Sequence, residues 1–300
     1  MSRQPVAGSG PGDRQPAVEA GAAATAATPP ASMQRVGVLC ALPRVLGELG
    51  VDPAGVLADA GLGPDALDRP DRWIPFAAGP RVLVAASRRS GCAHIGLSAA
   101  KGFGLAQLGL LGELMRNSPT VGDALRSYVV HQRLFSHGFV PYLFDYGERA
   151  HFGVAVYHPV ADDLSATYDL LLGATVVALR ELLGAGWRPR EVHLPREQPA
   201  DTRPYKQHFR GRLKFDAAHA ALVVASAELE QRVAGADPAR FRALDQEASA
   251  RFDGDLLPQL YRSLRILLVQ GEVTAAMLAQ QFAMHERTLS RRLRAQGVRF

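Results

Sequence analysis

Four polar side chains near the end of the printed sequence recur at the spacing of one helix face. Arg287, Ser290, Arg291 and Arg294 follow at i, i+3, i+4 and i+7, which places them on one side of a helix. The arginine fork matches guanine O6 and N7 in the DNA major groove, and further arginines can neutralise phosphates. A helix over residues 286–296 with this face is therefore suited to the major groove. The alternative is a surface helix hairpin whose arginines are simply solvated.

An apolar face on the same segment indicates what would hold this helix in place. Leu289 and Leu293 are spaced by one helical turn and are predicted to pack on a preceding short helix. Thr274 can cap that preceding helix, His285 is expected at the N-cap of the second, and Gly297 stands where a helix ends. The apolar stripe of the first helix comprises Ala275, Leu278, Ala279 and Phe282. We therefore expect two helices joined by a tight turn.

The positive charge of the chain is concentrated in the same segment. The 300 residues carry a formal net charge of +5, which permits a nucleic-acid partner without requiring one. Residues 271–300 hold five arginines against two glutamates. Most of the excess charge therefore lies at the proposed DNA-facing helix.

Other classes of protein find little support in the sequence. The two cysteines, Cys40 and Cys92, cannot form a disulfide framework and are expected to be buried free thiols in a reducing cytoplasm. No apolar stretch is long enough to predict a membrane span. The histidines form no helical metal-binding pair beside a glutamate, and no G-x-S-x-G elbow is present. We therefore predict a cytoplasmic protein that is not an enzyme and holds no metal or cofactor.

Composition and periodicity divide the chain into four parts. Residues 1–32 are rich in Ala, Gly and Pro and carry almost no large apolar side chain, so they are predicted to form a disordered tail. Residues 33–245 mix helix and strand patterns, which predicts an α+β effector domain. Residues 246–252 are the expected linker. The pattern of residues 253–300 is purely helical and predicts a partial all-α helix-turn-helix domain, which a helix capped by Asp255 would buttress.

Capping residues and periodicity predict the elements of the α+β domain. Helices are expected over 36–49, from Pro53 to Gly61, over 76–90, over 164–183, over 205–209 and from Asp237-Pro238. A further helix is expected to be capped by Ser118, with Pro119 at its first position. Two β-hairpins are expected, the first from 140–146 and 150–158 and the second from 211–216 and 221–224.

Several separated motifs resemble one protein family, in the right order along the chain. Leu278-Ala279 and the run Arg287-Thr288-Leu289-x-Arg291-x-Leu293 resemble the first helix-turn-helix of AraC/XylS-type bacterial transcription regulators. Ile95-Gly96-Leu97, Leu108–Gly112 and Ser118–Leu125 resemble runs typical of the effector domain called arabinose-binding-like in one branch of that family. The resemblance covers about residues 36–300 and is specific as a set.

The resemblance implies roles for the arginine-rich helix. In the family this helix reads bases, which implies base contacts for Arg287, Ser290 and Arg291, and we expect Arg292 and Arg294 to favour phosphates. The family's DNA-binding domain has two helix-turn-helix units, and residues 297–300 match only the lead-in to the helix that connects them. The sequence therefore predicts a DNA-binding domain that is truncated after its first unit.

Two functions remain in view. The first is a DNA-binding transcription regulator that responds to an unidentified small-molecule effector, with a homodimer as a further option. The alternative is a truncated ligand-binding or dimerisation module with little specific DNA binding. Ligand-binding residues stay unassigned, but a pocket is expected between the hairpins and the neighbouring helices. The polar and amphipathic candidates near those elements are Tyr128, His131, Arg133, Tyr142 and Tyr157.

Overall fold

The computed structural model describes residues 33–251, 260–261, 264, 274–282, 284–295 and 297–298. These residues all fall within one compact unit that spans residues 31–300. The predicted tail of residues 1–32 and the helix expected from Asp255 lie outside the described residues, apart from Leu260, Tyr261 and Leu264 of the latter.

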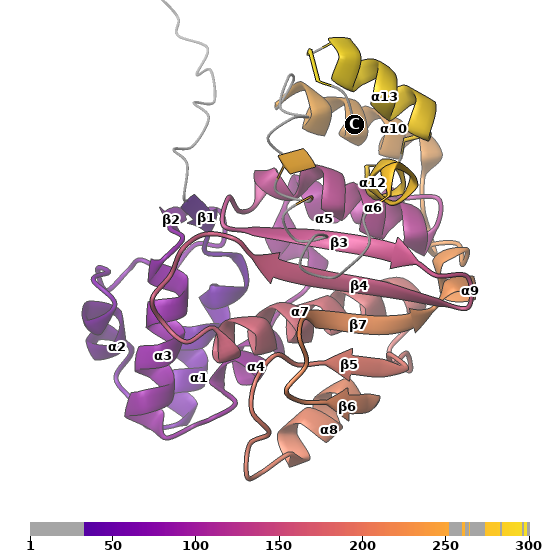
Figure 1. Ribbon diagram of the computed structural model, residues 1–300. Helices are drawn as coiled ribbons and strands as arrows, with labels where there is room; N and C mark the ends of the chain where they lie inside the picture. Colours follow the sequence, from indigo (N-terminus) through magenta and orange to yellow (C-terminus); the bar gives the residue numbers. More distant parts are fainter. Residues whose placement is uncertain are drawn as a thin grey trace, which may run out of the picture. The chain divides into compact units, whose positions relative to one another are not determined.

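The N-terminal part of the fold is helical, with a short two-stranded sheet at its start (Figure 1). Strand β1 (Met33–Arg35) pairs antiparallel with β2 (Trp73–Pro75), and neither strand was expected from the sequence. The helices that follow are η1 (Gly37–Ala41), α1 (Leu42–Glu48), α2 (Pro53–Asp59), α3 (Ala78–Ser90) and α4 (Ile95–Ala100). The expected helices in this region are confirmed, and Asp52 caps α2 by accepting hydrogen bonds from the N–H groups of Ala54 and Gly55 at 3.1 and 3.0 Å.

The second sheet has five strands in the order β3-β4-β7-β5-β6. The strands are β3 (Phe139–Asp145), β4 (Arg149–Val156), β5 (Glu191–His193), β6 (Arg212–Lys214) and β7 (Ala220–Ala225). The first predicted hairpin is confirmed, since β3 and β4 pair antiparallel with Tyr142 opposite Gly153. The predicted second hairpin is wrong. Strand β5 lies between β6 and β7, parallel to β6 and antiparallel to β7.

The insertion of β5 has a topological cause. Helix α8 (Arg203–Phe209) connects β5 to β6, and a strand–helix–strand connection of this kind brings the second strand back parallel to the first. Strand β7 then runs along the other side of β5 and also completes the pairing of β4. The order of the strands in the sheet therefore differs from their order in the sequence.

Helices cover one face of the five-stranded sheet and enclose the main core (Figure 1). They are η2 (Leu105–Leu108), α5 (Leu110–Asn117), α6 (Val121–His131), η3 (Gln132–Leu134) and α7 (Ser165–Leu183), with α9 (Ser226–Leu229) and α10 (Pro238–Ala250) following β7. Helix α7 contacts both β4 and β7 and also packs on α4. The predicted α+β class is confirmed for this part of the chain, and residues 246–250 of the expected linker continue α10 as helix.

The start of α6 differs from the prediction. The N-cap is Thr120, whose Oγ1 accepts a hydrogen bond from the N–H of Asp123 at 3.1 Å. Ser118 was expected to cap this helix, but its hydroxyl donates instead to the carbonyl of Leu114 at 2.9 Å, at the end of α5. The expectation of Ser118 and Pro119 as the first residues of the helix is therefore wrong, because the serine completes the preceding helix.

Two motif glycines allow helices to approach neighbouring backbone. A Cβ atom on Gly96 would lie 1.9 Å from the carbonyl oxygen of Ala166, where α4 packs on α7. A Cβ atom on Gly112 would lie 1.9 Å from the carbonyl oxygen of Leu105. Both positions therefore require glycine for close packing.

The C-terminal helices pack on the face of β3 that lies opposite the main core. Phe139 and Leu143 belong to the main core, whereas the alternate residues Val140, Tyr142 and Phe144 belong to a separate apolar cluster. This cluster includes residues of α12 (Ala275–Gln281) and α13 (Glu286–Ala295), namely Leu278, Ala279, Phe282, Leu289 and Leu293, together with Leu260. Because side chains alternate across a strand, β3 is buried on both faces. Helix α12 also contacts α6.

Candidate functional site

The two predicted faces of the arginine-rich helix are separated in the structure. Leu289 and Leu293 of α13 are each 1% exposed and lie in the apolar cluster with α12 and β3. The arginines Arg287, Arg291, Arg292 and Arg294 are exposed, and Ser290 is half-buried. At 3.6 residues per turn Arg287, Arg291 and Arg294 share the side opposite the leucines. Arg292 projects from a different side of the same helix.

Local hydrogen bonds fix the ends of these two helices. Thr274 Oγ1 accepts from the N–H of Met277 at 3.1 Å, and Nδ1 of His285 accepts from the N–H of Arg287 at 3.2 Å. These are the caps that the sequence predicted. At the other end of α13, Gly297 has a φ of 76° and Val298 N–H donates to the carbonyl of Leu293 at 2.9 Å. A left-handed glycine with this bond forms a Schellman stop.

The guanidinium groups of α13 could bind an anionic partner. Within the part of the chain that the structure describes, none of the arginines of α13 forms an ion pair with a carboxylate. Figure 1 shows α12 between α13 and the body of the fold, so that α13 lies at the periphery. An exposed cationic face on a helix held by buried leucines meets the requirements of a polyanion-binding surface.

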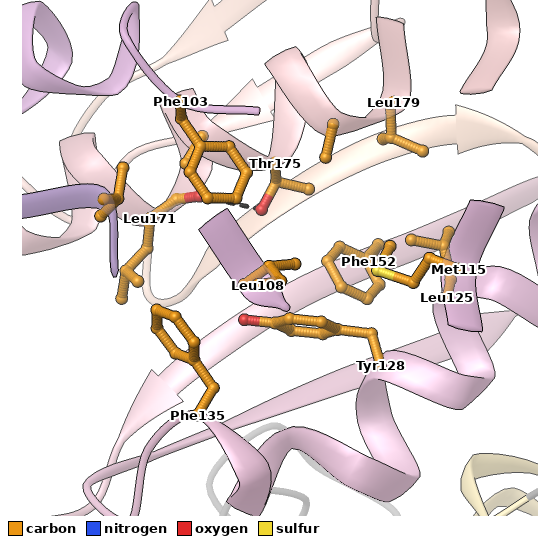
Figure 2. Close-up of a pocket in the computed structure, with 13 residues that line it drawn as sticks. Phe103, Leu108, Met115, Leu125, Tyr128, Phe135, Phe152, Leu171, Thr175 and Leu179 are labelled. Carbon is orange, nitrogen blue, oxygen red and sulfur yellow. Dashed lines mark hydrogen bonds between the residues drawn. The ribbon is translucent and has the colours of Figure 1, made fainter. Parts of the chain in front are cut away.

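A second candidate site is an apolar cavity on the helical side of the sheet. Its cavity volume is about 40 Å³, smaller than the several hundred Å³ of typical small-molecule sites. Its walls come from η1, η2, α5, α6, α7 and β4, and Figure 2 shows their side chains converging. The residues that line it are Val38, Phe103, Leu108, Met115, Leu125, Tyr128, Phe135, Phe152, Leu171, Ala174, Thr175, Ala178 and Leu179.

One of the predicted polar candidates lines this cavity. Tyr128 lies on α6 with its ring packed edge-on against Phe152, at 6.1 Å between centroids. The ring keeps some exposed surface because it faces the cavity. The apolar surroundings nonetheless bury the hydroxyl and raise its pKa above the ordinary value, so it stays a protonated donor at neutral pH.

The other candidates lie elsewhere and do not line the cavity. Nε2 of His131 contacts Asp245 Oδ1 at 2.9 Å, joining α6 to α10. Tyr142 lies on the opposite face of the sheet and donates to the carbonyl of Ala220 at 3.1 Å. Tyr157 donates to the carbonyl of His137, and Arg133 is not among the lining residues.

The cavity residues contributed by α7 were missed by the sequence prediction. Leu171, Thr175, Ala178 and Leu179 all come from this helix. Helix α7 is apolar around most of its circumference and packs against both α4 and the sheet. A helix with this composition is predicted to be buried on several sides. That signal indicates burial, but it does not tell which side faces an empty volume.

The structure also bears on metals and membranes, within the residues it describes. No group of three or more His, Cys, Asp or Glu side chains in these residues is arranged to hold a metal ion. None of the described helices combines the length and apolarity needed to cross a membrane.

A family comparison agrees with the motifs of the arabinose-binding-like domain. Residues 50–233 match the family described as the arabinose-binding domain of AraC transcription regulators, N-terminal. The HTH-type transcriptional regulator VirS of Mycobacterium tuberculosis is 26% identical over 265 residues, which cover 85% of this chain and 76% of VirS. The crystal structure of the transcriptional regulator CdpR from Pseudomonas aeruginosa aligns with a TM-score of 0.45 and 23% identity over 68% of each chain.

Proposed function

The chain belongs to the AraC family of transcription regulators, and from this premise we propose that it reads DNA through α13 under the control of a small molecule held in the cavity. The observation that carries the DNA-binding part is the division of α13 into a buried leucine face and an exposed arginine face that no described carboxylate neutralises. The effector part rests on the apolar cavity with its single available tyrosine hydroxyl.

The residues of α13 divide into two roles. Arg287 and Arg291 lie on the side opposite the leucines, and the half-buried Ser290 lies on a flank between the two faces. From these positions the three side chains can reach base edges in the major groove. Arg292 projects to one flank, and Arg294 lies one turn beyond Arg291; we assign both to phosphate contacts. Base contacts confer sequence preference, and phosphate contacts add affinity for every sequence.

A physical route connects the cavity to the DNA-facing helix. Leu125 and Tyr128 of α6 line the cavity, and α6 also contacts α12. Helix α12 shares an apolar cluster with Leu289 and Leu293 of α13. A ligand that binds more tightly when α6 is in one position would favour the matching positions of α12 and α13. The size of this shift is set by the difference in ligand affinity between the two positions of α6.

The test is a DNA-binding titration monitored by fluorescence anisotropy over a series of salt concentrations. The 300-residue protein is compared with Arg291→Ala and with Arg188→Ala, a matched control at an exposed arginine in the loop before β5. We expect salt-dependent binding that Arg291→Ala weakens and Arg188→Ala leaves unchanged. Equal effects of the two substitutions would contradict the assignment to α13. Ligand binding without any DNA binding would favour a ligand-binding or dimerisation module instead.

A further inference from the structure

The cavity offers a ligand very few polar partners. Of its 13 lining side chains, two carry hydroxyls and the rest are aliphatic, aromatic or thioether groups. One of the two hydroxyls is already committed, because Oγ1 of Thr175 donates to the carbonyl of Leu171 at 2.8 Å within α7. The remaining hydroxyl belongs to Tyr128, which makes no hydrogen bond to another described residue.

The Tyr128 hydroxyl is directed into the empty volume. Figure 2 shows its oxygen pointing into the cavity from α6, with Phe135 and Leu108 on either side. Its pKa is raised by burial, so the group presents a proton and not a phenolate at neutral pH. A neutral phenol in an apolar wall is suited to donate one hydrogen bond to an acceptor on a bound molecule.

A sugar does not fit this distribution of polar groups. Each hydroxyl that leaves water must find a partner in the protein, and an unpaired one weakens binding. A pentose carries several hydroxyls around its ring, whereas this cavity has one uncommitted donor. The arabinose-binding description of the matched family domain therefore does not predict the ligand class of this cavity.

We infer that the cavity selects a compact, largely apolar molecule with a single hydrogen-bond acceptor, which the Tyr128 hydroxyl recognises, and that it excludes sugars. The apolar walls favour a small ring or a short chain, because burial of apolar surface provides the affinity. With a cavity volume of about 40 Å³, the lining side chains must move apart to admit such a ligand. The Tyr128 hydroxyl orients the bound molecule and discriminates ligands with a hydrogen-bond acceptor from those without one. This inference rests on the proposed effector role of the cavity and assigns its ligand class.

The test uses acetophenone, its near-isosteric hydrocarbon α-methylstyrene, and L-arabinose as probes of the full 300-residue protein. Binding is measured by calorimetric titration and by the shift in Tm that a ligand of the folded state produces. We expect acetophenone to bind roughly five- to tenfold more tightly than α-methylstyrene, the factor that corresponds to one net hydrogen bond. L-arabinose should produce no shift.

Two variants locate the effect. Tyr128→Phe should abolish the preference for acetophenone and leave the affinity for α-methylstyrene unchanged, since only the hydroxyl is removed. Ala178→Phe places a ring in the cavity and should block both probes. Circular dichroism establishes whether each variant folds. If Ala178→Phe does not fold, the methyl resonance of Met115, which lines the cavity, should shift when acetophenone is added to the wild-type protein.

The outcomes separate the ligand class from the regulatory role. Binding of L-arabinose in preference to acetophenone, or a ketone preference that survives Tyr128→Phe, would overturn the inferred ligand class. If such an arabinose complex altered DNA binding, the effector function would stand while the ligand class failed. Acetophenone binding that depends on Tyr128 but never changes DNA affinity would support the ligand class and count against the effector function.

Discussion

Nε2 of His131 lies 2.9 Å from Oδ1 of Asp245, a contact that joins α6 to α10 across 114 residues of sequence. The imidazole side chain is 6% exposed and the carboxylate 47% exposed. Because α6 also lines the cavity through Tyr128, this pair fixes the helix that would sense a ligand. His131 is therefore a structural link between helices and not a ligand-binding group.

Removal of this link should destabilise the fold modestly. We expect Asp245→Ala to lower the free energy of unfolding by about 1 kcal/mol, the usual net contribution of one hydrogen bond. Urea denaturation measures the change. Glu247→Ala is the control on the same helix, where the partner Arg251 is exposed, and its effect should be smaller. An equal loss of unfolding free energy in both variants would show that the His131–Asp245 contact stabilises the fold no more than the exposed Glu247–Arg251 pair.

A buried ion pair predicts a much larger effect. Asp169 on α7 is 0% exposed and pairs with Arg196, which also donates to the hydroxyl of Tyr205 at 2.6 Å. Tyr205 in turn donates to the same carboxylate at 2.6 Å. Arg196→Met would leave a buried carboxylate without its cation, and this should cost about 3–5 kcal/mol of unfolding free energy.

The control for Arg196 is an arginine in an exposed pair. Arg203 contacts Asp201 with its side chain 82% exposed, so Arg203→Met should change stability far less. Thermal or urea unfolding of both variants compares the two pairs directly. Similar stability losses would contradict the claim that burial makes the Arg196 pair critical.

Two helical glycines should respond to alanine in opposite directions. Gly96→Ala would bring a methyl group against the Ala166 carbonyl, where 1.9 Å is available, and should destabilise the protein by about 1–3 kcal/mol or more. A methyl group on Gly47 in α1 would have no neighbouring atom within 4 Å. Gly47→Ala should therefore stabilise the helix by about 0.5–1 kcal/mol. A loss of stability at both positions, measured by urea denaturation, would refute the close-packing explanation.

The histidine of α8 predicts a pH dependence of stability. His208 is buried, its Nε2–H donates to the carbonyl of Gly173 at 3.0 Å, and burial lowers its pKa to about 4. The unfolded chain takes up this proton near pH 6.5, so the unfolded state binds more protons between the two values. Stability is therefore fully present above about pH 6.5 and is lost progressively as the pH falls toward 4, by at most about 1.4 kcal/mol per pH unit.

His208→Gln should reduce that slope, because glutamine can donate the same hydrogen bond without titrating. Urea denaturation between pH 4 and 7 measures the slope in both proteins. Part of the dependence should remain, since burial also lowers the pKa of His151 to about 4. An unchanged slope in His208→Gln would assign the acid sensitivity to other groups.

The proposed DNA face predicts two distinguishable arginine variants. Arg291→Ala should cost about 1–3 kcal/mol on the preferred sequence and relax the sequence preference. Arg294→Ala should weaken all sequences alike and reduce the slope of log affinity against log salt by about one. Binding titrations on specific and scrambled duplexes at several salt concentrations measure both quantities. If Arg294→Ala relaxed the sequence preference and Arg291→Ala weakened all sequences alike, the two assigned roles would have to be reversed.

Local sequence determined much of this protein. The two faces of α13 follow from side-chain type and the period of 3.6 residues, and the buried Leu289 and Leu293 confirm the apolar face. The caps at Asp52, Thr274 and Asp237 are local contacts between a side chain and the next turn of backbone. Such features are predictable because they depend on residues within a few positions of one another.

Only the tertiary structure decided how these elements pair. The strands β6 and β7 are close in sequence, yet β5 lies between them, because pairing depends on where α8 returns the chain. The strand period predicts that Tyr142 and Leu143 point to opposite faces of β3, but not that α12 covers one face and the main core the other. A periodic pattern identifies which residues share a face, but not which element packs against that face.

The cavity shows most clearly that local sequence does not determine how distant segments pack. Tyr128 was a candidate beside His131 and Tyr142, and all three are helix or strand residues with polar tips. Packing placed the first against an empty volume, the second against Asp245 and the third beneath the carbonyl of Ala220. A cavity exists where side chains from distant segments fail to fill the space between them, and no short stretch of sequence contains that information.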